Sequence, residues 1–585
     1  MKRNKIRTLI PLLFVLSACN LGGTQATGYT YIKKYKYDKD FHWQQAVGHP
    51  DVRRNYGEHD WSDEKTDVSG NVYHTCLICN CKQYIVEDGS GFSEVTQFTS
   101  PVEIHTEYQQ KYLAYKENKY DKMPQNSYPD GNKNISDPVF TRIMWSYENH
   151  REDLTYSISI SQNEDMEDSF AIVGDENQYI DAYNFYLGKN YYRINAIDPF
   201  GETHSSKVYS LTVNDVAPRN LYVGARMTNC RDMGGRKVLA GGTIKQGILY
   251  RTCGNGYNQD GKKIDDEGKE ILLNQLRVKT ELNCHNNSSY DFNLTGTKTY
   301  ATLMDYADGS PSKHHFSRNT ESVKNVFEIL AKEESYPVYF HCRIGTDRTG
   351  LVAILLYGVL GVDINYIYQD YLFSNFGKIG SKRKIGTDEA DDISKYITEI
   401  QKLPGASFNE QCYNALITIG VPKETINKIL DIFIEGEKPN YDKEQVVVAA
   451  KDMNIANGTL KTEAKTTLTE RNYPSSYVTL ANGTTVTATF NVTTAADKQA
   501  YIYVGNSDAS DSKKIESSIS AQIDGKTIVI PQISFKEAVM GNCNGSRVNY
   551  YFVKLGDLGN LLSGQHTITV VGVSNNLILG NIAVL

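Results

Sequence analysis

The chain has 585 residues, a length that suggests about four domains at roughly 150 residues per domain. Glycine (45 residues) and proline (15 residues) stand at ordinary levels, which excludes a collagen-like or low-complexity chain. The 62 basic and 69 acidic residues give a net charge of −7, which excludes a chain-wide basic surface for nucleic acid. No apolar run approaches the roughly 20 residues that span a bilayer.

The N-terminus has the layout of a secretory signal. A basic start is followed by a short apolar stretch over 9–16 and then by Leu16-Ser17-Ala18-Cys19. These last residues resemble a bacterial lipobox, which implies cleavage before Cys19 and a diacylglycerol group on its thiol. An ordinary signal peptide with a chance cysteine is the alternative. We therefore expect residues 1–19 to be a lipoprotein signal peptide, and the mature protein to be lipid-anchored on the extracellular face of a bacterial cell membrane.

Histidine and cysteine are concentrated in the next segment, 28–90, which resembles small His/Trp/Cys modules of Gram-positive surface proteins. Side chains of these two types suit tetrahedral Zn²⁺, so a structural zinc site is a candidate here. A disulfide or free, buried thiols are the alternatives. Spacing does not identify the ligating histidines. The candidate ligands are His49, His59, Cys76 and Cys79.

Alternating polar and apolar residues over 136–214 are typical of short β-strands, for example at 154–160 and 191–196. Strands of this length, about ten residues apart, predict a β-sandwich. Trp145 on an early strand and the late run Gly188-Lys-Asn-Tyr-Tyr192 resemble a fibronectin type III module. We expect Trp145 to lie in the core rather than in a binding site.

The chemistry lies within 215–437, where strand and helix patterns alternate. A strand-like run ends at His341-Cys342, a short loop follows, and Arg348-Thr349-Gly350 leads into an apolar helix. This pattern resembles the His-Cys-x5-Arg-Thr signature of Cys-dependent phosphatases, in the strand–loop–helix setting that the signature needs. The residues of the predicted phosphate-binding loop are Arg343, Ile344, Gly345, Thr346, Asp347 and Arg348.

Each residue of this signature has a physical role to fill. The N–H groups of the loop and the positive end of the helix can hold a phosphate dianion, with Arg348 as a two-pronged partner. The same field lowers the pKa of Cys342, so that its thiolate attacks phosphorus and forms a phosphocysteine intermediate. Thr349 can hydrogen-bond the sulfur, and His341 holds the shape of the loop. Catalysis needs no cofactor or metal, because Arg348 and the N–H groups neutralise the charge.

Further motifs strengthen the resemblance. The runs Asn229-x-Arg231-Asp232-x-Gly-Gly and Gly-x-x-x-Arg251, with an Asp370-Tyr-x-x-Ser segment, resemble the bacterial tyrosine-phosphatase family that has His-Cys-x-x-Gly-x-Asp-Arg-Thr-Gly loops. The resemblance covers roughly 215–437. It implies that Arg231, Asp232 and Arg251 brace the floor of the active site, with Asp370 in support. An ordinary ion pair beside a turn is the alternative for Arg231 and Asp232.

Two positions depart from the family pattern. Thr346 stands where the family often has a lysine that suits phosphoinositide headgroups, although Arg343 offers another cation. Asn283 stands where the family tends to have an aspartate. The proton donor for the leaving oxygen is therefore open. Asp347 in the loop is our first choice, and Asp308, in a turn-like segment 34 residues before the nucleophile, is the second.

Residues 445–585 return to an alternating β pattern, for example at 484–490 and 565–570. The region loosely resembles the galactose-binding-like jelly rolls that serve as carbohydrate-binding modules. It contains no tryptophan, although tyrosine could stack on a sugar. A spacer sandwich is the alternative, so a surface glycan is a candidate partner only.

The sequence thus predicts a multidomain chain with an α/β Cys-phosphatase core flanked by β-sandwich modules. We expect an extracellular, lipid-anchored phosphatase that hydrolyses phosphate monoesters, with protein phosphotyrosine as the leading substrate. Hydrolysis of inositol phosphates or phosphoinositides is one alternative. A surface binding protein with an inactive phosphatase-like domain is another, kept open by Asn283. The expected partners are a phosphorylated substrate, the membrane through the lipid anchor and a surface glycan, but not nucleic acid.

Overall fold

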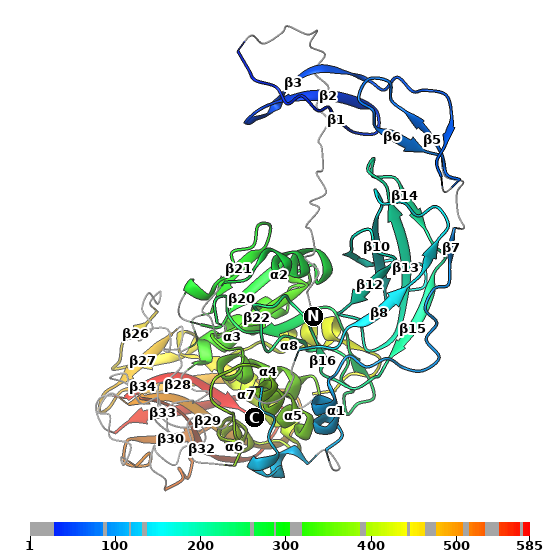
Figure 1. Cartoon of the computed structure of the whole chain (residues 1–585). Helices are drawn as coiled ribbons and strands as arrows, with labels where there is room; N and C mark the ends of the chain where they lie inside the picture. Colours follow the sequence, from blue (N-terminus) through cyan, green and yellow to red (C-terminus); the bar gives the residue numbers. More distant parts are fainter. Residues whose placement is uncertain are drawn as a thin grey trace. The chain divides into compact units, whose positions relative to one another are not determined.

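The computed structural model describes residues 28–68, 70–85, 91–115, 119–131, 137–257, 263–285, 288–302, 304, 319–386, 393–441, 445–462, 476–506, 514–532, 549–573 and 577–585. The chain forms two compact units (Figure 1). The first joins the described residues up to Ile104 with Phe140–Asn214, and the second joins His105–Val139 with everything from Asp215 onward. None of the helices described is long and apolar enough to cross a membrane.

The N-terminal module, residues 28–85, consists of two small antiparallel sheets in which β2 lies between β1 and β3, and β5 between β4 and β6. Among its described residues, the buried apolar ones are Trp43, Ala46, Cys76 and Cys81. So small an apolar core contributes little stability by itself. The strands are β1 (Lys36–Tyr37), β2 (Phe41–Ala46), β3 (His49–Glu58), β4 (Lys65–Thr66), β5 (Val72–Thr75) and β6 (Lys82–Tyr84).

The rest of the first unit is antiparallel β-structure. One sheet has the order β11-β10-β13-β14 with β15 also on β13, and the pairs β8–β12 and β7–β9 are separate. Trp145 follows β8, is buried, and packs edge-on against Tyr156 of β10, so it lies in the core as expected. The strands are β7 (Phe92–Ser93), β8 (Thr141–Met144), β9 (Ser146–Tyr147), β10 (Thr155–Ser161), β11 (Phe170–Val173), β12 (Tyr179–Ala182), β13 (Gly188–Ile197), β14 (Thr203–Ser205) and β15 (Tyr209–Val213).

The second unit is built on a sheet of order β16-β17-β19-β22-β20-β21. Strands β19, β22, β20 and β21 run parallel, so their carboxyl ends meet at one edge, while β16 and β17 pair antiparallel beside them. A short pair, β18–β23, lies apart. The strands are β16 (Arg219–Asn220), β17 (Arg231–Asp232), β18 (Thr243–Ile244), β19 (Leu249–Thr252), β20 (Thr280–Asn283), β21 (Lys298–Ala301), β22 (Val338–His341) and β23 (Ile434–Glu435).

Helices follow and precede these strands. The central one, α4, begins directly after the loop that follows β22, and all of its 13 residues are buried. An apolar helix of this kind needs neighbours on every side. The helices of the unit are α1 (Glu107–Leu113), α2 (Asp266–Glu270), which continues as a π-helical turn (Ile271–Gln275), α3 (Thr320–Leu330), α4 (Asp347–Val359), α5 (Ile364–Phe373), α6 (Ser394–Gln401), α7 (Phe408–Thr418) and α8 (Lys423–Phe433).

The C-terminal region consists of two antiparallel sheets of order β26-β27-β34-β29-β32, with β24 also on β34, and β25-β28-β33-β30-β31. Buried aliphatic side chains from both sheets form one core. The strands are β24 (Val446–Ala449), β25 (Asn454–Ala456), β26 (Leu460–Lys461), β27 (Tyr477–Leu480), β28 (Thr485–Val492), β29 (Ala496–Asn506), β30 (Ile519–Ile523), β31 (Lys526–Thr527), β32 (Asn549–Leu561), β33 (Gly564–Gly572) and β34 (Leu577–Val584).

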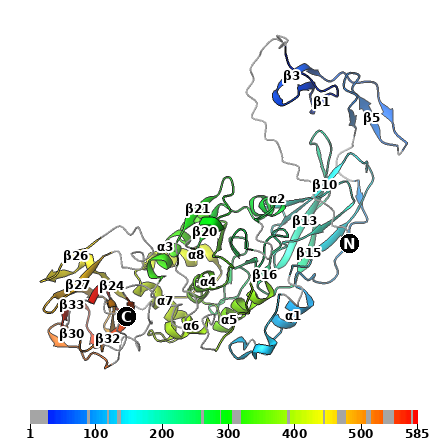
Figure 2. The same ribbon diagram turned by 60° about the vertical axis from the view of Figure 1, so that its left-hand side comes forward.

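The segment 105–139 joins the second unit, although in sequence it lies between two parts of the first. Its helix α1 begins with a capping box at Thr106 and lies beside α5 in both views (Figures 1 and 2). The Tyr112 hydroxyl donates to the Gln369 carbonyl of α5 at 2.7 Å, and the Gln369 amide donates to the Tyr120 hydroxyl at 2.8 Å. This segment therefore stabilises the helix that carries Asp370.

Candidate active site

The loop that begins at Cys342 follows the carboxyl end of β22, with β19 on one side and β20 on the other. Helix α4 begins at Asp347, so its positive end faces the loop. Gly345 has a φ of +71°, and a Cβ placed there would meet the Thr252 carbonyl oxygen at 2.1 Å. Only glycine satisfies both conditions, which explains its place in the loop.

Two side chains hold the carbonyl groups of the loop from outside. Arg251 donates from Nη2 to the Gly345 carbonyl at 2.8 Å, and Asn229 donates from Nδ2 to the Ile344 carbonyl at 3.0 Å. In a planar trans peptide the C=O and N–H groups point in opposite directions. Carbonyls held outward therefore turn the N–H groups inward, where they form a concave site for an anion.

Asp370 of α5 is the anion that positions both of these donors. Its carboxylate accepts hydrogen bonds from Arg231 Nε at 2.8 Å and from Arg251 Nη1, and Arg231 also donates to the Asn229 side-chain oxygen. The two arginine side chains are 0% exposed and Asp370 is 2% exposed. Burial raises the pKa of Asp370, but the two guanidinium groups outweigh it and hold that pKa well below its ordinary value.

The contacts of Asp232 lie at the turn after β17 and at the start of β19, whereas the family resemblance implies that it braces the floor of the active site. It accepts from Arg219 Nη1 at 2.8 Å and from the N–H groups of Gly234 and Gly247, each at 2.7 Å. These contacts fix the turn after β17 and the start of β19. Its neighbour Arg231 points to Asp370 instead, because adjacent residues of a strand face opposite sides of the sheet.

The environment of Cys342 favours its ionised form. Burial alone raises the pKa of this thiol, and so does the nearby charge of Asp347. The Arg348 guanidinium, with the hydroxyl and N–H groups of Thr349, outweighs both and lowers the pKa of Cys342 to about 7. A free cysteine titrates near 8.5, so a much larger share of Cys342 is a nucleophilic thiolate at neutral pH.

Two further cysteines lie beside the nucleophile. Strands β19, β22 and β20 are parallel and in register, and Cys253, Cys342 and Cys284 each follow the last residue of one of them. Burial raises the pKa of Cys253 to about 11 and that of Cys284 to about 12. Both are therefore thiols at neutral pH, and of the three cysteines Cys342 supplies the thiolate.

His341 lies beneath the loop with both ring nitrogens engaged. Its Nε2 is 3.0 Å from Glu281 Oε1, and its Nδ1 is 2.9 Å from the Cys342 carbonyl oxygen. Burial raises the pKa of Glu281, but hydrogen bonds led by that from His341 outweigh it, so the pKa is lowered and Glu281 is a carboxylate. Glu281 and the Cys342 carbonyl are both hydrogen-bond acceptors. His341 thus ties the start of the loop to β20.

Asp347 makes a contact that its sequence pattern does not indicate. Arg383 donates from Nε to Asp347 Oδ1 at 2.8 Å and from Nη2 to Oδ2 at 3.0 Å, and both residues are buried. A guanidinium that donates to both oxygens suits the ionised carboxylate. Asp347 must therefore leave Arg383 before it can donate a proton. The second choice for the acid, Asp308, lies outside the described residues.

The structure also shows the contacts of Thr346 and Asn283, the two positions that depart from the family pattern, and of Arg343. The Thr346 hydroxyl is buried and accepts from Asn229 Nδ2 at 3.2 Å, so it takes part in holding the loop. Arg343 is exposed, with its guanidinium 5.1 Å from the centre of the Tyr257 ring. Asn283 donates its side-chain N–H to the Asp291 carboxylate. Arg343 is thus the loop residue that offers a cation to solvent.

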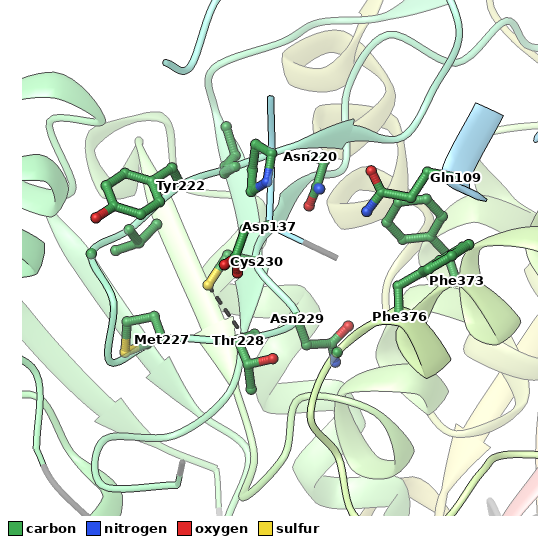
Figure 3. A pocket seen from close by; sticks show the side chains of 15 residues that line it. Gln109, Asp137, Asn220, Tyr222, Met227, Thr228, Asn229, Cys230, Phe373 and Phe376 are labelled. Carbon is green, nitrogen blue, oxygen red and sulfur yellow. Dashed lines mark hydrogen bonds between the residues drawn. The ribbon is translucent and has the colours of Figure 1, made fainter. Parts of the chain in front are cut away.

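A small hollow lies beside Asn229, one of the side chains that hold the loop carbonyls (Figure 3). Gln109 and Asp137 reach it from segment 105–139, and Phe373 lines it from the end of α5. Inside it the Cys230 thiol donates to the Thr228 carbonyl at 3.4 Å. No residue of the loop from 342 to 348 lines this hollow, so it is distinct from the anion site.

The remaining predicted site residues lie elsewhere. Cys19 is outside the described residues. His59, Cys76 and Cys79 lie together in the N-terminal module, but His49 does not join them. It is exposed at the opposite end of β3 from His59. The histidine that does join the group is His42 of β2, because His42 lies opposite the end of β3 in the strand register.

Alkylation of Cys342 by iodoacetamide should have a pH midpoint of about 7, because the thiolate is the reactive form. Arg348→Met should move this midpoint upward, since the cation that lowers the pKa is removed. Mass spectrometry of peptides after timed labelling gives the rate for each cysteine. A midpoint near 8.5 in the unaltered chain, or equal labelling of Cys253 or Cys284, would contradict this account.

Asp370→Asn should destabilise the second unit by about 3–5 kcal/mol, because it leaves two buried guanidinium groups without their counter-charge. The change in the free energy of unfolding is measured by urea denaturation, with the loss of vanadate binding as the signal. Glu107→Gln is the matched control, since it breaks an exposed ion pair with Lys111 and should leave the transition nearly unchanged. Equal midpoints for the two variants would show that Asp370 does not hold the loop.

In the comparison with known proteins, residues 224–436, which contain the site, match the model of a tyrosine phosphatase family. No curated protein matches the chain. A family 35 carbohydrate binding module from Clostridium thermocellum is 16% identical, with a TM-score of 0.19 over 24% of this chain and 98% of that one. The core catalytic domain of a PP-IP phosphatase from S. cerevisiae is 20% identical, with a TM-score of 0.18 over 23% and 76%. We draw no conclusion from structural similarities this low. The family match contains the whole loop and the side chains that hold it, Asn229, Arg251 and Asp370.

Proposed function

We propose that this chain is a Cys-dependent phosphatase that hydrolyses phosphate monoesters, with protein phosphotyrosine as its leading substrate. The observation that carries the proposal is the position of Cys342 at the foot of a loop whose carbonyl groups are held outward by Arg251 and Asn229, so that its N–H groups form an anion site. The match of 224–436 to a tyrosine phosphatase family supports the same chemistry. The layout of residues 1–19 supports an extracellular, lipid-anchored location.

In the first step, a phosphate dianion enters the loop and meets inward N–H groups, the positive end of α4 and the Arg348 guanidinium. The Cys342 thiolate attacks phosphorus opposite the leaving oxygen. An S–P bond forms, the P–O bond to the leaving group breaks, and that oxygen takes a proton from an acid. Arg348 and the loop N–H groups stabilise the charge on the equatorial oxygens.

In the second step, water attacks phosphorus of the phosphocysteine. The O–P bond forms as the S–P bond breaks, and the sulfur leaves as a thiolate. The features that lower the pKa of Cys342 also ease this departure, because they stabilise the same thiolate. Inorganic phosphate is then released, and the water proton passes to the group that served as the acid.

Inositol phosphate or phosphoinositide hydrolysis is the second candidate. The observation that favours it is Arg343, which is exposed at the loop beside Tyr257 and can meet a further phosphate group. Released phosphate across a panel of phosphopeptides and inositol phosphates separates the two candidates. An Arg343→Ala variant that loses turnover only of the multiply phosphorylated substrates would favour the second.

Cys342→Ser should lose measurable turnover of an aryl phosphate while it still binds vanadate, because the anion site remains. Cys284→Ser is the matched control: its thiol is buried beside the nucleophile but protonated, so this variant should keep its activity within a few-fold. Phosphate release in a continuous assay measures both. A Cys342→Ser variant with a tenth of the unaltered rate would rule out the proposed nucleophile.

The acid can be identified through the leaving group. If Asp347 donates the proton, Asp347→Asn should slow phosphotyrosine hydrolysis by about 10²-fold and slow a nitro-substituted aryl phosphate much less. Arg383→Met breaks the ion pair but keeps the carboxyl group, so it serves as the matched control. If Arg383→Met reproduces the loss, the ion pair matters and not the acid. If Asp308→Asn alone shows the leaving-group effect, the acid is Asp308.

A further inference from the structure

The N-terminal module contains a cluster of histidine and cysteine side chains far from the reactive cysteine in sequence. The ligand atoms of His42, His59, Cys76 and Cys79 all lie within 4.8 Å of one another. They come from β2, from the residue after β3 and from the turn between β5 and β6. Three separate parts of a small module thus direct imidazole and thiol groups to one point.

The spacing of these atoms matches a metal site. Zn–S bonds of about 2.3 Å and Zn–N bonds of about 2.0–2.1 Å place neighbouring sulfur and nitrogen ligands about 3.5 Å apart on a tetrahedron. Cys79 Sγ and His59 Nδ1 are 3.5 Å apart. Cys81 Sγ is also 3.5 Å from His59 Nδ1, but it is 3.1 Å from Cys79 Sγ, closer than the roughly 3.8 Å between two sulfurs on one zinc ion. Cys81 therefore fits a thiol that hydrogen-bonds a ligand better than a ligand itself.

His42 and His59 each have a ring nitrogen that is available to a metal ion. His59 Nε2 lies 2.9 Å from the Asp38 carbonyl oxygen, so it carries the proton and leaves the Nδ1 lone pair directed at the sulfurs. This second contact is the usual means by which a protein orients a ligating histidine. His42 is 3% exposed, and its Nδ1 has no hydrogen-bond partner in the described structure. A bound cation would satisfy a buried nitrogen of this kind.

The turn that carries the cysteines has the geometry of a thiolate-ligating loop. The Cys79 N–H donates to Cys76 Sγ at 3.5 Å, and Asn80 directly after it has a φ of +59°. This left-handed residue turns the chain back, so that the Cys81 carbonyl accepts from the Cys76 N–H at 2.8 Å and closes the turn. The module has few buried apolar residues, and small domains of this kind commonly depend on a metal or disulfides.

We propose that the N-terminal module binds one Zn²⁺ ion through His42, His59, Cys76 and Cys79. The ion joins β2, the end of β3 and the β5–β6 turn, and thereby stabilises the module. This inference does not depend on the proposed function, since none of its residues takes part in phosphate hydrolysis. A Cys76–Cys79 disulfide is the competing state of these thiols.

Titration of the reduced, chelator-treated chain with Co²⁺ tests this site, because cobalt reports its ligands by absorption. One equivalent should produce the intense visible bands of tetrahedral cobalt with thiolate charge transfer, and Zn²⁺ should remove them. Cys76→Ser, Cys79→Ser, His42→Ala and His59→Ala should each lose the tetrahedral spectrum. Absence of these bands in the unaltered, reduced chain would overturn the proposal.

Three control variants make the result specific. His49→Ala should bind cobalt normally, since His49 is exposed outside the cluster. Cys342→Ser should also bind normally, which excludes the reactive cysteine as the source of the bands. Cys81→Ser should keep the tetrahedral spectrum. Loss of the spectrum in Cys81→Ser together with its retention in His42→Ala would overturn the ligand set.

Discussion

The site depends on hydrogen bonds that keep the carbonyl groups of the loop after Cys342 directed away from the anion site. Arg251 and Asn229 bind these carbonyls, and both are positioned through the single carboxylate of Asp370. Together with the contacts of His341 to the Cys342 carbonyl and of the Gly254 N–H to the Arg343 carbonyl, they direct the loop N–H groups to a common centre, although a short loop has many alternative backbone conformations. The chemistry of Cys342 thus rests on a buried ion cluster below it.

This cluster also shows how the chain accepts buried charge near its reactive centre. Two arginines share one aspartate, and His341 links the Glu281 carboxylate to the start of the loop. Arg231, Arg251 and Asp370 pair with one another, which offsets the cost of removing their charges from water. The remaining positive charge faces the loop, where it favours a thiolate and an incoming phosphate group.

Much of the loop could be predicted from sequence, because its strand, signature residues and apolar helix follow one another directly. The partners of these residues could not be predicted, since they come from distant segments: Glu281 lies 60 residues before His341, and Arg383 lies 36 residues after Asp347. The contact of segment 105–139 with α5 was likewise missed, because an insertion of the first unit separates it from the sheet. The sequence also suggested His49 as a metal ligand, whereas His42 lies in the cluster. Spacing along the chain does not show which histidines face one another, because this depends on the strand register.

The central claim is that a phosphoryl group passes through the sulfur of Cys342. Rapid acid quenching of the enzyme during turnover of an aryl phosphate, followed by mass spectrometry of its peptides, tests this claim most directly. The account predicts one phosphoryl group on the peptide that contains Cys342, and none on that peptide in Cys342→Ser. Phosphoryl transfer to another residue, or turnover without any covalent phosphoenzyme, would contradict it.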